Sequence, residues 1–430
     1  MKILKLLLTI ITLFEIITGC SYEDIDDVGV KTPSSSARFS EDDKQFLNTL
    51  FHTKYLWYDR VPDAINLAQY DTPKALIDAE KFGASDRWSF ALQVEPKELG
   101  SFFDSDAIGF GIGFRTDLVV NYVQIYSPAW GKIRRGDTLL KINGNDANAN
   151  LVRIQARKLD EPTHFTLRRD NKQIVVTLTP QHYTRHVTLD RIFKSEGKTF
   201  GYLRCDRFSE GLADELAHRF EDLASADVDE MIVDLRYNSG GDISQAVSLM
   251  EYLDGSHPGE VATHLRWNDR FRASDTDYRF TSPPPSHALH ISRVIFLVTR
   301  ETASASELVI NGLKPYLDDV VVIGTPTDGK NVGMRAITHN DYTYYLINFY
   351  VENAAGDRSS VQGISPTCPA QDDLQYTMGD LQEPMMQTAV YYALHSQCPD
   401  AQMGNKLGAA YPVAHTQFVD GEKPLSVMVR

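Results

Sequence analysis

Three short segments of the chain carry residue types that could do chemistry on an acyl group. The pair Gly240–Gly241 follows an apolar run, Ser304 precedes a predicted helix, and Lys330 follows a glycine turn. Backbone N–H groups beside glycines and at a helix N-terminus can stabilise the negative oxygen of a tetrahedral intermediate. Together the three segments predict acyl transfer with a serine nucleophile.

A serine hydroxyl is a weak nucleophile that needs an adjacent base. The chain has no G-x-S-x-G segment, and none of its 12 histidines lies in a recognisable triad context. We therefore expect Lys330 to be the base. An apolar pocket could lower its pKa from about 10.4 to about 7.5, at a cost of roughly 4 kcal/mol. Neutral Lys330 would take the proton of Ser304 and return it to the leaving amine.

Alternating strands and helices should position these segments. Leu212, Leu216, Phe220 and Leu223 recur at helical spacing, and a second helix is expected to run through Leu253. The predicted strands are 199–205, 231–235, 294–298 and 320–323, and a third helix is predicted over 305–316. Right-handed crossovers make such strands parallel, so their carboxyl ends meet at one edge of an α/β sheet. Residues 255–287 are expected to form a long irregular excursion.

Two other regions differ in pattern from this core. Residues 40–78 predict short helices, the first capped by Ser40, in an N-terminal helical cap that runs to about Leu99. Residues 106–180 predict short strands and glycine turns. Within them, Gly109-Phe110-Gly111-Ile112-Gly113 is no dinucleotide fingerprint, because glycine recurs at every second position and no βαβ pattern follows.

Composition excludes several classes of protein. The 430 residues are 42% hydrophobic with a net charge of -15, which is globular and argues against a nucleic-acid partner. No C-x-x-C or H-E-x-x-H is present, and His182 and His186 lack a further ligand, so neither a metal nor a cofactor is predicted. Of the four cysteines, Cys368 and Cys398 are the expected disulfide pair, because Cys205 lies inside a predicted strand.

The first 20 residues predict export. A positive start is followed by an apolar run, 6–14, that is too short to cross a bilayer. Ile17-Thr18-Gly19-Cys20 resembles a bacterial lipobox, which implies a lipidated Cys20; a plain secretory signal is the alternative. The acidic residues after Cys20 resemble a surface-export signal of Gram-negative outer-membrane lipoproteins. We expect an outer-membrane anchor in the cell envelope, on either the periplasmic or the external face.

The segments Thr302-Ala303-Ser304-Ala305-Ser306-Glu307 and Gly324-Thr325-Pro326-Thr327-Asp328-Gly329-Lys330 resemble those of the carboxyl-terminal processing peptidases, or tail-specific proteases. Residues 234–241 are similar to the oxyanion segment of that family, and residues 363–366 to a later signature. The series 127–129, 133–137 and 139–144 resembles a PDZ domain, whose loop, here Gly109 to Gly113, presents N–H groups to a peptide carboxylate. An unrelated small β-domain is the alternative for this region.

The resemblance implies an α/β fold with a crotonase/Clp-protease-like core of parallel strands, a β-rich PDZ domain and a helical cap. It implies Ser304 as nucleophile, Lys330 as general base, and an oxyanion hole from Ala305 with Gly240 or, preferably, Gly241. Ser306 is the rival nucleophile and Glu307 is expected to be structural. Met334 stands where relatives often carry a glutamine that orients the lysine. The implied segments are a signal peptide (1–19), tether (20–39), cap (40–99), PDZ domain (105–182), catalytic domain (186–400) and tail (401–430).

The predicted function is a lipid-anchored serine endopeptidase that captures protein substrates by their C-terminal tails. One alternative is a catalytically weak or inactive lipoprotein that only binds peptides or scaffolds other envelope proteins. The other is a crotonase-like acyl-CoA enzyme, which leaves Lys330 and the PDZ-like segment unexplained. Neither substrate identity nor oligomeric state is predicted.

Overall fold

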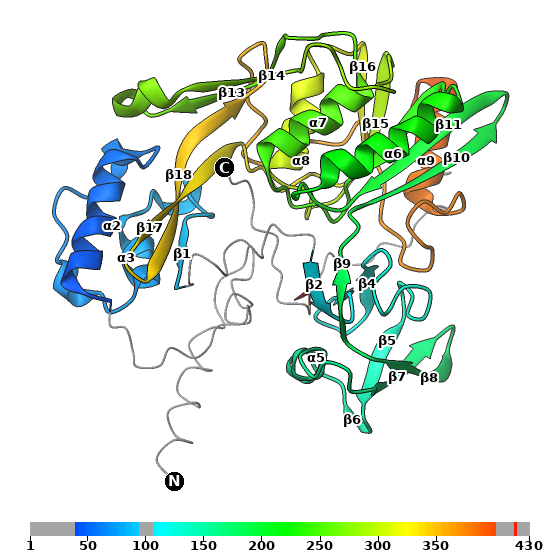
Figure 1. Ribbon diagram of the computed structural model, residues 1–430, viewed down its shortest axis with the longest axis horizontal. Helices are drawn as coiled ribbons and strands as arrows, with labels where there is room; N and C mark the ends of the chain where they lie inside the picture. Colours follow the sequence, from blue (N-terminus) through cyan, green and yellow to red (C-terminus); the bar gives the residue numbers. More distant parts are fainter. Residues whose placement is uncertain (1–38, 94–105, 401–416, 419–430) are drawn as a thin grey trace.

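A six-stranded sheet forms the centre of the molecule in the computed structural model, which describes residues 39–93, 106–400 and 417–418. The strand order is β10-β11-β12-β15-β16-β19 (Figure 1), and every pair is parallel except β10 with β11. The strands are β10 (Thr188–Ser195), β11 (Lys198–Cys205), β12 (Glu230–Asp234), β15 (Arg293–Val298), β16 (Asp319–Gly324) and β19 (Cys368–Pro369). The predicted parallel core is therefore confirmed.

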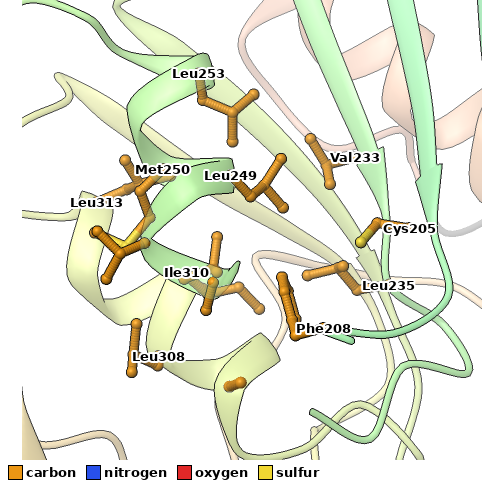
Figure 2. Close-up of a cluster of buried hydrophobic side chains, with 14 of the residues drawn as sticks. Cys205, Phe208, Val233, Leu235, Leu249, Met250, Leu253, Leu308, Ile310 and Leu313 are labelled. Atoms are coloured by element: carbon orange, nitrogen blue, oxygen red, sulfur yellow. The ribbon is translucent and has the colours of Figure 1, made fainter. Parts of the chain in front are cut away.

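Helices cover both faces of this sheet. On one face lie α6 (Leu212–Ser225), α7 (Ile243–Leu253) and α8 (Ala305–Leu313), and on the other lies α9 (Pro384–His395). Neighbouring residues of β12 divide between the two cores: Val233 belongs to the cluster formed with the three helices, of which α7 and α8 are seen in Figure 2, while Ile232 packs with α9. This alternation follows from the two-residue period of a strand. Because both faces are buried, each strand is a short apolar run that could be predicted from the sequence.

A second sheet, entirely antiparallel, carries the N-terminal helices α2 (Glu41–Thr53) and α3 (Pro73–Glu80). Its order is β1-β18-β13-β14, with β17 on β18. The strands are β1 (Phe90–Leu92), β13 (Val261–Trp267), β14 (Thr276–Arg279), β17 (Val332–His339) and β18 (Tyr342–Glu352). Ser40 caps α2 as expected, accepting a hydrogen bond from the Asp43 N–H at 3.1 Å.

This second sheet corrects one prediction. Residues 255–287 are not wholly irregular, because β13 and β14 lie within them, joined by a 3₁₀ segment at Asp269–Ser274. Strand β13 pairs antiparallel with β14 and also with the distant β18, where Arg266 lies opposite Tyr350. A strand that pairs with a segment so distant in the chain carries little local signal, and the polar residues and prolines around it obscured the pattern.

A smaller β-rich unit spans most of residues 106–184, at the lower right of Figure 1. Its own core includes Phe110, Val120, Ile142 and Phe165. The elements are β2 (Asp106–Gly109), β3 (Ile112–Phe114), β4 (Val120–Val123), β5 (Thr138–Ile142), β6 (Asn145–Asp146), α5 (Ala149–Ala156), β7 (Thr163–Arg169), β8 (Lys172–Leu178) and β9 (Gln181–Thr184). The outer edge of β3 pairs antiparallel with β20 (Gln417–Phe418), from the C-terminal region of the same chain.

The expected disulfide between Cys368 and Cys398 is present, and Cys205 is a buried free thiol. The predicted signal, Cys20 and most of the tether lie outside the described residues. Among the described helices, none has the length and apolar character to cross a membrane.

Candidate functional site

The three predicted segments leave the same edge of the central sheet. Asp234 at the end of β12 lies opposite Leu297 of β15, and Val298 of β15 lies opposite Gly324 of β16. The strands therefore end level with one another. The loops that follow them, residues 235–242, 299–304 and 325–331, meet at the carboxyl edge, where open α/β sheets place their sites.

Hydrogen bonds hold these loops together. Thr302 Oγ1 donates to the Leu235 carbonyl at 2.7 Å, and the Ala303 N–H donates to the Asn238 carbonyl at 3.2 Å. The Asp328 N–H donates to the Thr302 carbonyl at 3.0 Å. The serine loop thus lies between the glycine loop and the lysine loop and is bonded to both.

Ser304 sits at the N-terminus of α8 in a strained conformation. Its φ of 62° and ψ of -112° are unusual for a residue with a β-carbon, and such strain persists only where surrounding contacts impose it. The side chain is 2% exposed, and its Oγ has no hydrogen-bond partner among the described residues. A buried hydroxyl without a partner is costly, so it is available for another group.

Gly240 lies directly against this serine, and Gly241 lies against Phe208. A β-carbon on Gly240 would fall 2.9 Å from Ser304 Cβ, and one on Gly241 would fall 2.1 Å from the Phe208 carbonyl oxygen. Both residues have positive φ, 114° and 141°. Only glycine allows the backbone to approach the serine at position 240 and Phe208 at position 241 this closely.

One of the two glycine N–H groups is already occupied. Gly240 donates to Asn238 Oδ1 at 2.9 Å, while the N–H groups of Gly241 and Ala305 have no acceptor within the described part of the chain. The geometry therefore favours Gly241 and Ala305 over Gly240 as oxyanion donors.

Glu307 joins the serine and lysine loops through one carboxylate. Its Oε2 accepts the N–H groups of both Ser304 and Lys330, each at 2.8 Å. Its Oε1 accepts the Gly329 N–H at 2.8 Å and the Thr327 hydroxyl. Burial raises the pKa of this carboxyl to about 7, although the bonds from Thr327 and Ser304 act in the opposite direction.

Lys330 is buried like Ser304, at 2% exposed. Its Nζ lies 5.7 Å from the centre of the Trp88 ring, which belongs to the N-terminal region. Met334, four residues further on, is fully buried in the apolar cluster between the N-terminal helices and the second sheet. Ser304 Oγ has no hydrogen bond to Lys330 in this structure; the two residues are linked through their backbone N–H groups, which both bond Glu307.

Ser306 is committed to a structural contact. Its Oγ donates to the Asn238 carbonyl at 2.8 Å, and the residue is fully buried. A hydroxyl that donates its proton to a backbone acceptor is a poor nucleophile, so the geometry favours Ser304.

A buried charge network connects the β-rich unit to the glycine loop. Arg236, which is 0% exposed, pairs with Asp234 at 2.6 Å, Asp372 at 2.6 Å and Glu383 at 3.3 Å. Asp372 also accepts hydrogen bonds from Tyr237 and from Arg135 of the β-rich unit. Burial alone would raise the pKa of Asp372, but Arg135 and Arg236 lower it to about 2.

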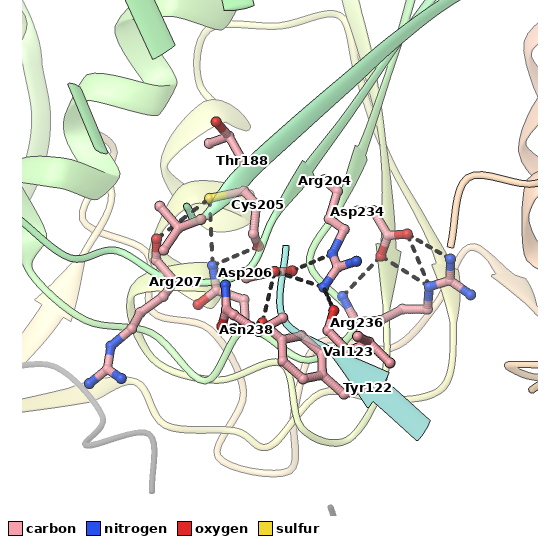
Figure 3. A network of polar contacts seen from close by, with 12 residues as sticks. Tyr122, Val123, Thr188, Arg204, Cys205, Asp206, Arg207, Asp234, Arg236 and Asn238 are labelled. Atoms are coloured by element: carbon pink, nitrogen blue, oxygen red, sulfur yellow. Dashed lines mark hydrogen bonds and ion pairs between the residues drawn. The ribbon is translucent and has the colours of Figure 1, made fainter. Parts of the chain in front are cut away.

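A second contact lies beside the first (Figure 3). Arg204 of β11 pairs with Asp206 at 2.6 Å and donates to the Val123 carbonyl at 3.1 Å. Tyr122 donates to Asp206 at 2.8 Å. Strand β4 of the β-rich unit is thus bonded to the strand that leads into the site.

The loop expected to bind a peptide carboxylate lies between β2 and β3. Gly109 ends β2, Ile112 and Gly113 belong to β3, and Phe110 is buried in the core of the unit. Gly111 has a φ of 73°, and a β-carbon there would fall 2.1 Å from Ser127 Cβ. The five residues are therefore contiguous with the edge strand that accepts β20.

Sequence reasoning missed several residues of the site. Asn238 donates from Nδ2 to the Cys205 carbonyl at 3.0 Å, while its other polar atoms bond Gly240 and the serine loop. Asp372 and Trp88 are far from the motifs in sequence, so no local pattern pointed to them. Asn238, by contrast, lies within a segment already singled out and could have been found there.

Within the described residues, one group of side chains is spaced to hold a metal ion: Asp42, Asp43 and His339. His339 already bonds Asp42 at 2.8 Å, and Asn340 bonds Asp43 at 2.9 Å. These contacts explain the cluster as a polar link between α2 and the β17–β18 turn.

Comparisons with known proteins find similarity to one family of peptidases. A family model described as peptidase family S41 matches residues 199–370, and one described as the peptidase S41 N-terminal domain matches residues 42–90. The carboxy-terminal processing protease CtpB of Bacillus subtilis is 22% identical over 312 residues, which cover 68% of this chain and 62% of that protein. A CtpA-like serine protease of Staphylococcus aureus is 24% identical over 275 residues, covering 60% and 52%. The chain thus spans less than two thirds of each of these relatives.

Among solved structures, an S41 protease from Bacteroides fragilis superposes with a TM-score of 0.67 at 22% identity. The match covers 82% of this chain and 97% of that one. At this identity the likeness shows a shared mixed α/β fold.

Replacing Glu307 by Gln should destabilise the protein although the side chain keeps its size. All four partners of the carboxylate are donors, so the amide NH₂ of Gln must face some of them and leave them unsatisfied. We expect a melting temperature lower by about 5–10 °C. The matched control is Glu221→Gln, at an exposed position of α6. Equal melting temperatures for the two variants would show that Glu307 does not hold the loops.

Proposed function

Because this chain belongs to peptidase family S41, we propose that it is a serine endopeptidase with a Ser304–Lys330 dyad. The observation that carries the proposal is the shared burial of Ser304 and Lys330 on two loops joined by Glu307, beside the unoccupied N–H groups of Gly241 and Ala305. The family supports the activity of a serine peptidase, and the geometry supports the choice of these two residues.

In the proposed reaction, Ser304 Oγ attacks the scissile carbonyl while neutral Lys330 takes its proton. The tetrahedral oxyanion accepts hydrogen bonds from Gly241 and Ala305. Collapse breaks the C–N bond, the proton passes from Lys330 to the leaving amine, and an acyl-enzyme remains on Ser304. Water then attacks the ester while Lys330 takes its proton; the C–Oγ bond breaks, Lys330 returns the proton to Ser304 Oγ, and the carboxylic acid is released.

The absence of a hydrogen bond between Ser304 Oγ and Lys330 is compatible with this mechanism. Catalytic hydrogen bonds are often long or misaligned in the absence of substrate and tighten in the complex. Ser304 Oγ, which has no hydrogen-bond partner among the described residues, would form its hydrogen bond to Lys330 when substrate binds.

Ser304→Ala should abolish both peptide cleavage and labelling by a fluorophosphonate probe, with a loss of at least about 10³-fold. Ser306→Ala is the matched control and should remain labelled, because Ser306 Oγ is bonded to the Asn238 carbonyl. The measurement is intact-protein mass spectrometry after exposure to the probe. Labelling of Ser304→Ala at the wild-type rate would remove Ser304 from the mechanism. A wild-type chain that binds peptides but is never acylated would favour the peptide-binding alternative.

The β-rich unit is proposed to act as a PDZ domain that captures the C-terminal tails of protein substrates. Its edge strand β3 follows the glycine loop, and this edge accepts an added antiparallel strand, as β20 does. A peptide bound in this way would place its terminal carboxylate at Gly109 to Gly113. The unit is also bonded to the catalytic core through Arg135 and Tyr122.

Peptides with a free C-terminal carboxylate should bind the Ser304→Ala chain at least about 10-fold more tightly than the same peptides ending in an amide. The reason is that the amide removes the charge that the backbone N–H groups of the loop would bind. Fluorescence anisotropy with the paired peptides measures this difference. Equal affinities would mean that tails are not recognised by their carboxylate.

The chain is further proposed to be anchored to the outer membrane through lipidated Cys20, so that its substrates are proteins of the cell envelope. The lipobox-like Ile17-Thr18-Gly19-Cys20 motivates this proposal. Expressed in a Gram-negative host, the wild type should incorporate a radiolabelled fatty acid and Cys20→Ser should not. Cys205→Ser, which removes a buried thiol, is the control. Incorporation that persists in Cys20→Ser would contradict the anchor.

A further inference from the structure

The N-terminal region reaches the lysine loop through a short segment before β1. Trp88 donates from Nε1 to Asp328 Oδ2 at 3.1 Å, and Arg87 donates to the Asp328 carbonyl at 3.0 Å. The Trp88 ring lies over Lys330, with 5.7 Å between the ring centre and Nζ. Two consecutive residues of the N-terminal region therefore contact the turn that carries the lysine.

This segment is held firmly from its other side. Asp86 accepts the N–H groups of Trp88 and Ser89 at 3.0 and 2.9 Å, and it also accepts the Tyr55 hydroxyl at 2.7 Å. Ser89 Oγ accepts the Ile347 N–H of β18 at 3.0 Å. Trp88 itself is 8% exposed and packs in the cluster formed by the N-terminal helices and the second sheet. Its ring is thus fixed by the cap and presented to the lysine.

We propose that Trp88 is a positioning residue for the reaction, which covers Lys330, keeps water from its amine and directs it toward Ser304. The proposal rests on the Ser304–Lys330 mechanism and extends it to the N-terminal region. It also identifies a group that can orient the lysine where Met334, buried in the apolar cluster, offers only the weakly accepting sulfur of its thioether.

The ring acts on Lys330 in two opposite ways. As an apolar wall it excludes water and disfavours the ammonium form, while its π face attracts a cation. Desolvation of a buried amine is the larger effect, because it can move a titration by several pH units. Removing the Trp88 ring should therefore make Lys330 harder to deprotonate.

Other charged groups lie near the lysine on each element around it. Asp328 is on the same loop, Glu307 comes from α8, and Arg87 comes from the N-terminal segment at 4.0 Å from Asp328. None of these is removed by a substitution at Trp88. A change in the pH profile of such a variant therefore reports on the ring rather than on a lost charge.

The test is the rate of fluorophosphonate labelling of Ser304 between pH 5 and 10, in the full chain. Trp88→Ala should react at least about 10-fold more slowly at neutral pH, with the acid limb of its profile moved to higher pH by about one unit or more. Trp88→Phe keeps a ring but loses the bond to Asp328, so its profile should stay near that of the wild type. Trp57→Ala is the matched control, since Trp57 belongs to the same cluster and bonds Tyr350 at 2.9 Å.

The outcomes separate this inference from the proposed function. A wild-type chain that is never labelled would overturn the dyad, and the role of Trp88 with it. Labelling of the wild type with coincident pH profiles for Trp88→Ala, Trp57→Ala and the wild type would overturn the role of Trp88 alone. Circular dichroism verifies folding, and Trp88→Leu, with the same expected direction of shift, replaces the Ala variant if that variant does not fold.

Discussion

The candidate site depends on one carboxylate that accepts hydrogen bonds from the serine loop and the lysine loop at once. Glu307 lies one helical turn after Ser304, and the same Oε2 atom bonds the backbone N–H of Ser304 and that of Lys330. The separation of the two loops is therefore determined by main-chain groups rather than by the flexible lysine side chain. Burying an acceptor of this kind is unfavourable unless each lone pair is used, and here four donors converge on it. The helix N-terminus adds a favourable field for the same negative charge.

The buried ions around Arg236 follow a different logic. Three carboxylates surround one guanidinium that is wholly removed from water, and such an arrangement gives little net stability over an apolar core. What it does provide is geometry, because Asp372 bonds Arg236 and Tyr237 next to the glycine pair and Arg135 in the β-rich unit. A displacement of that unit would break the buried ion pair between Arg135 and Asp372. The orientation of the β-rich unit and the conformation of the glycine loop are thus energetically linked.

The parallel core and the three site loops could be predicted because their signals are local. Apolar runs such as 294–298 must be buried on both faces, and the order of strands and helices then brings the loop ends together. Strand β13 and the short β1 were missed, because each pairs with β18, which is remote in sequence. Trp88 and Asp372 were missed for a similar reason, because each reaches the site from a segment without a motif. Glu307 was expected to be structural, but the four groups that donate hydrogen bonds to it could be identified only from the structure.

The position of Trp88 changes how the N-terminal helices relate to the chemistry. Strand β1 follows directly after this residue and pairs with β18, while β17, on the other side of β18, continues from the lysine loop. The segment that covers Lys330 and the segment that carries it are therefore bonded to the same central strand. Because β1 and β17 both pair with β18, the sheet resists separation of the two segments. A shift of either strand would break its hydrogen bonds to β18 and move apolar side chains out of their cluster. The second sheet, which contains no residue of the proposed dyad, is in this sense part of the framework that keeps water from the lysine.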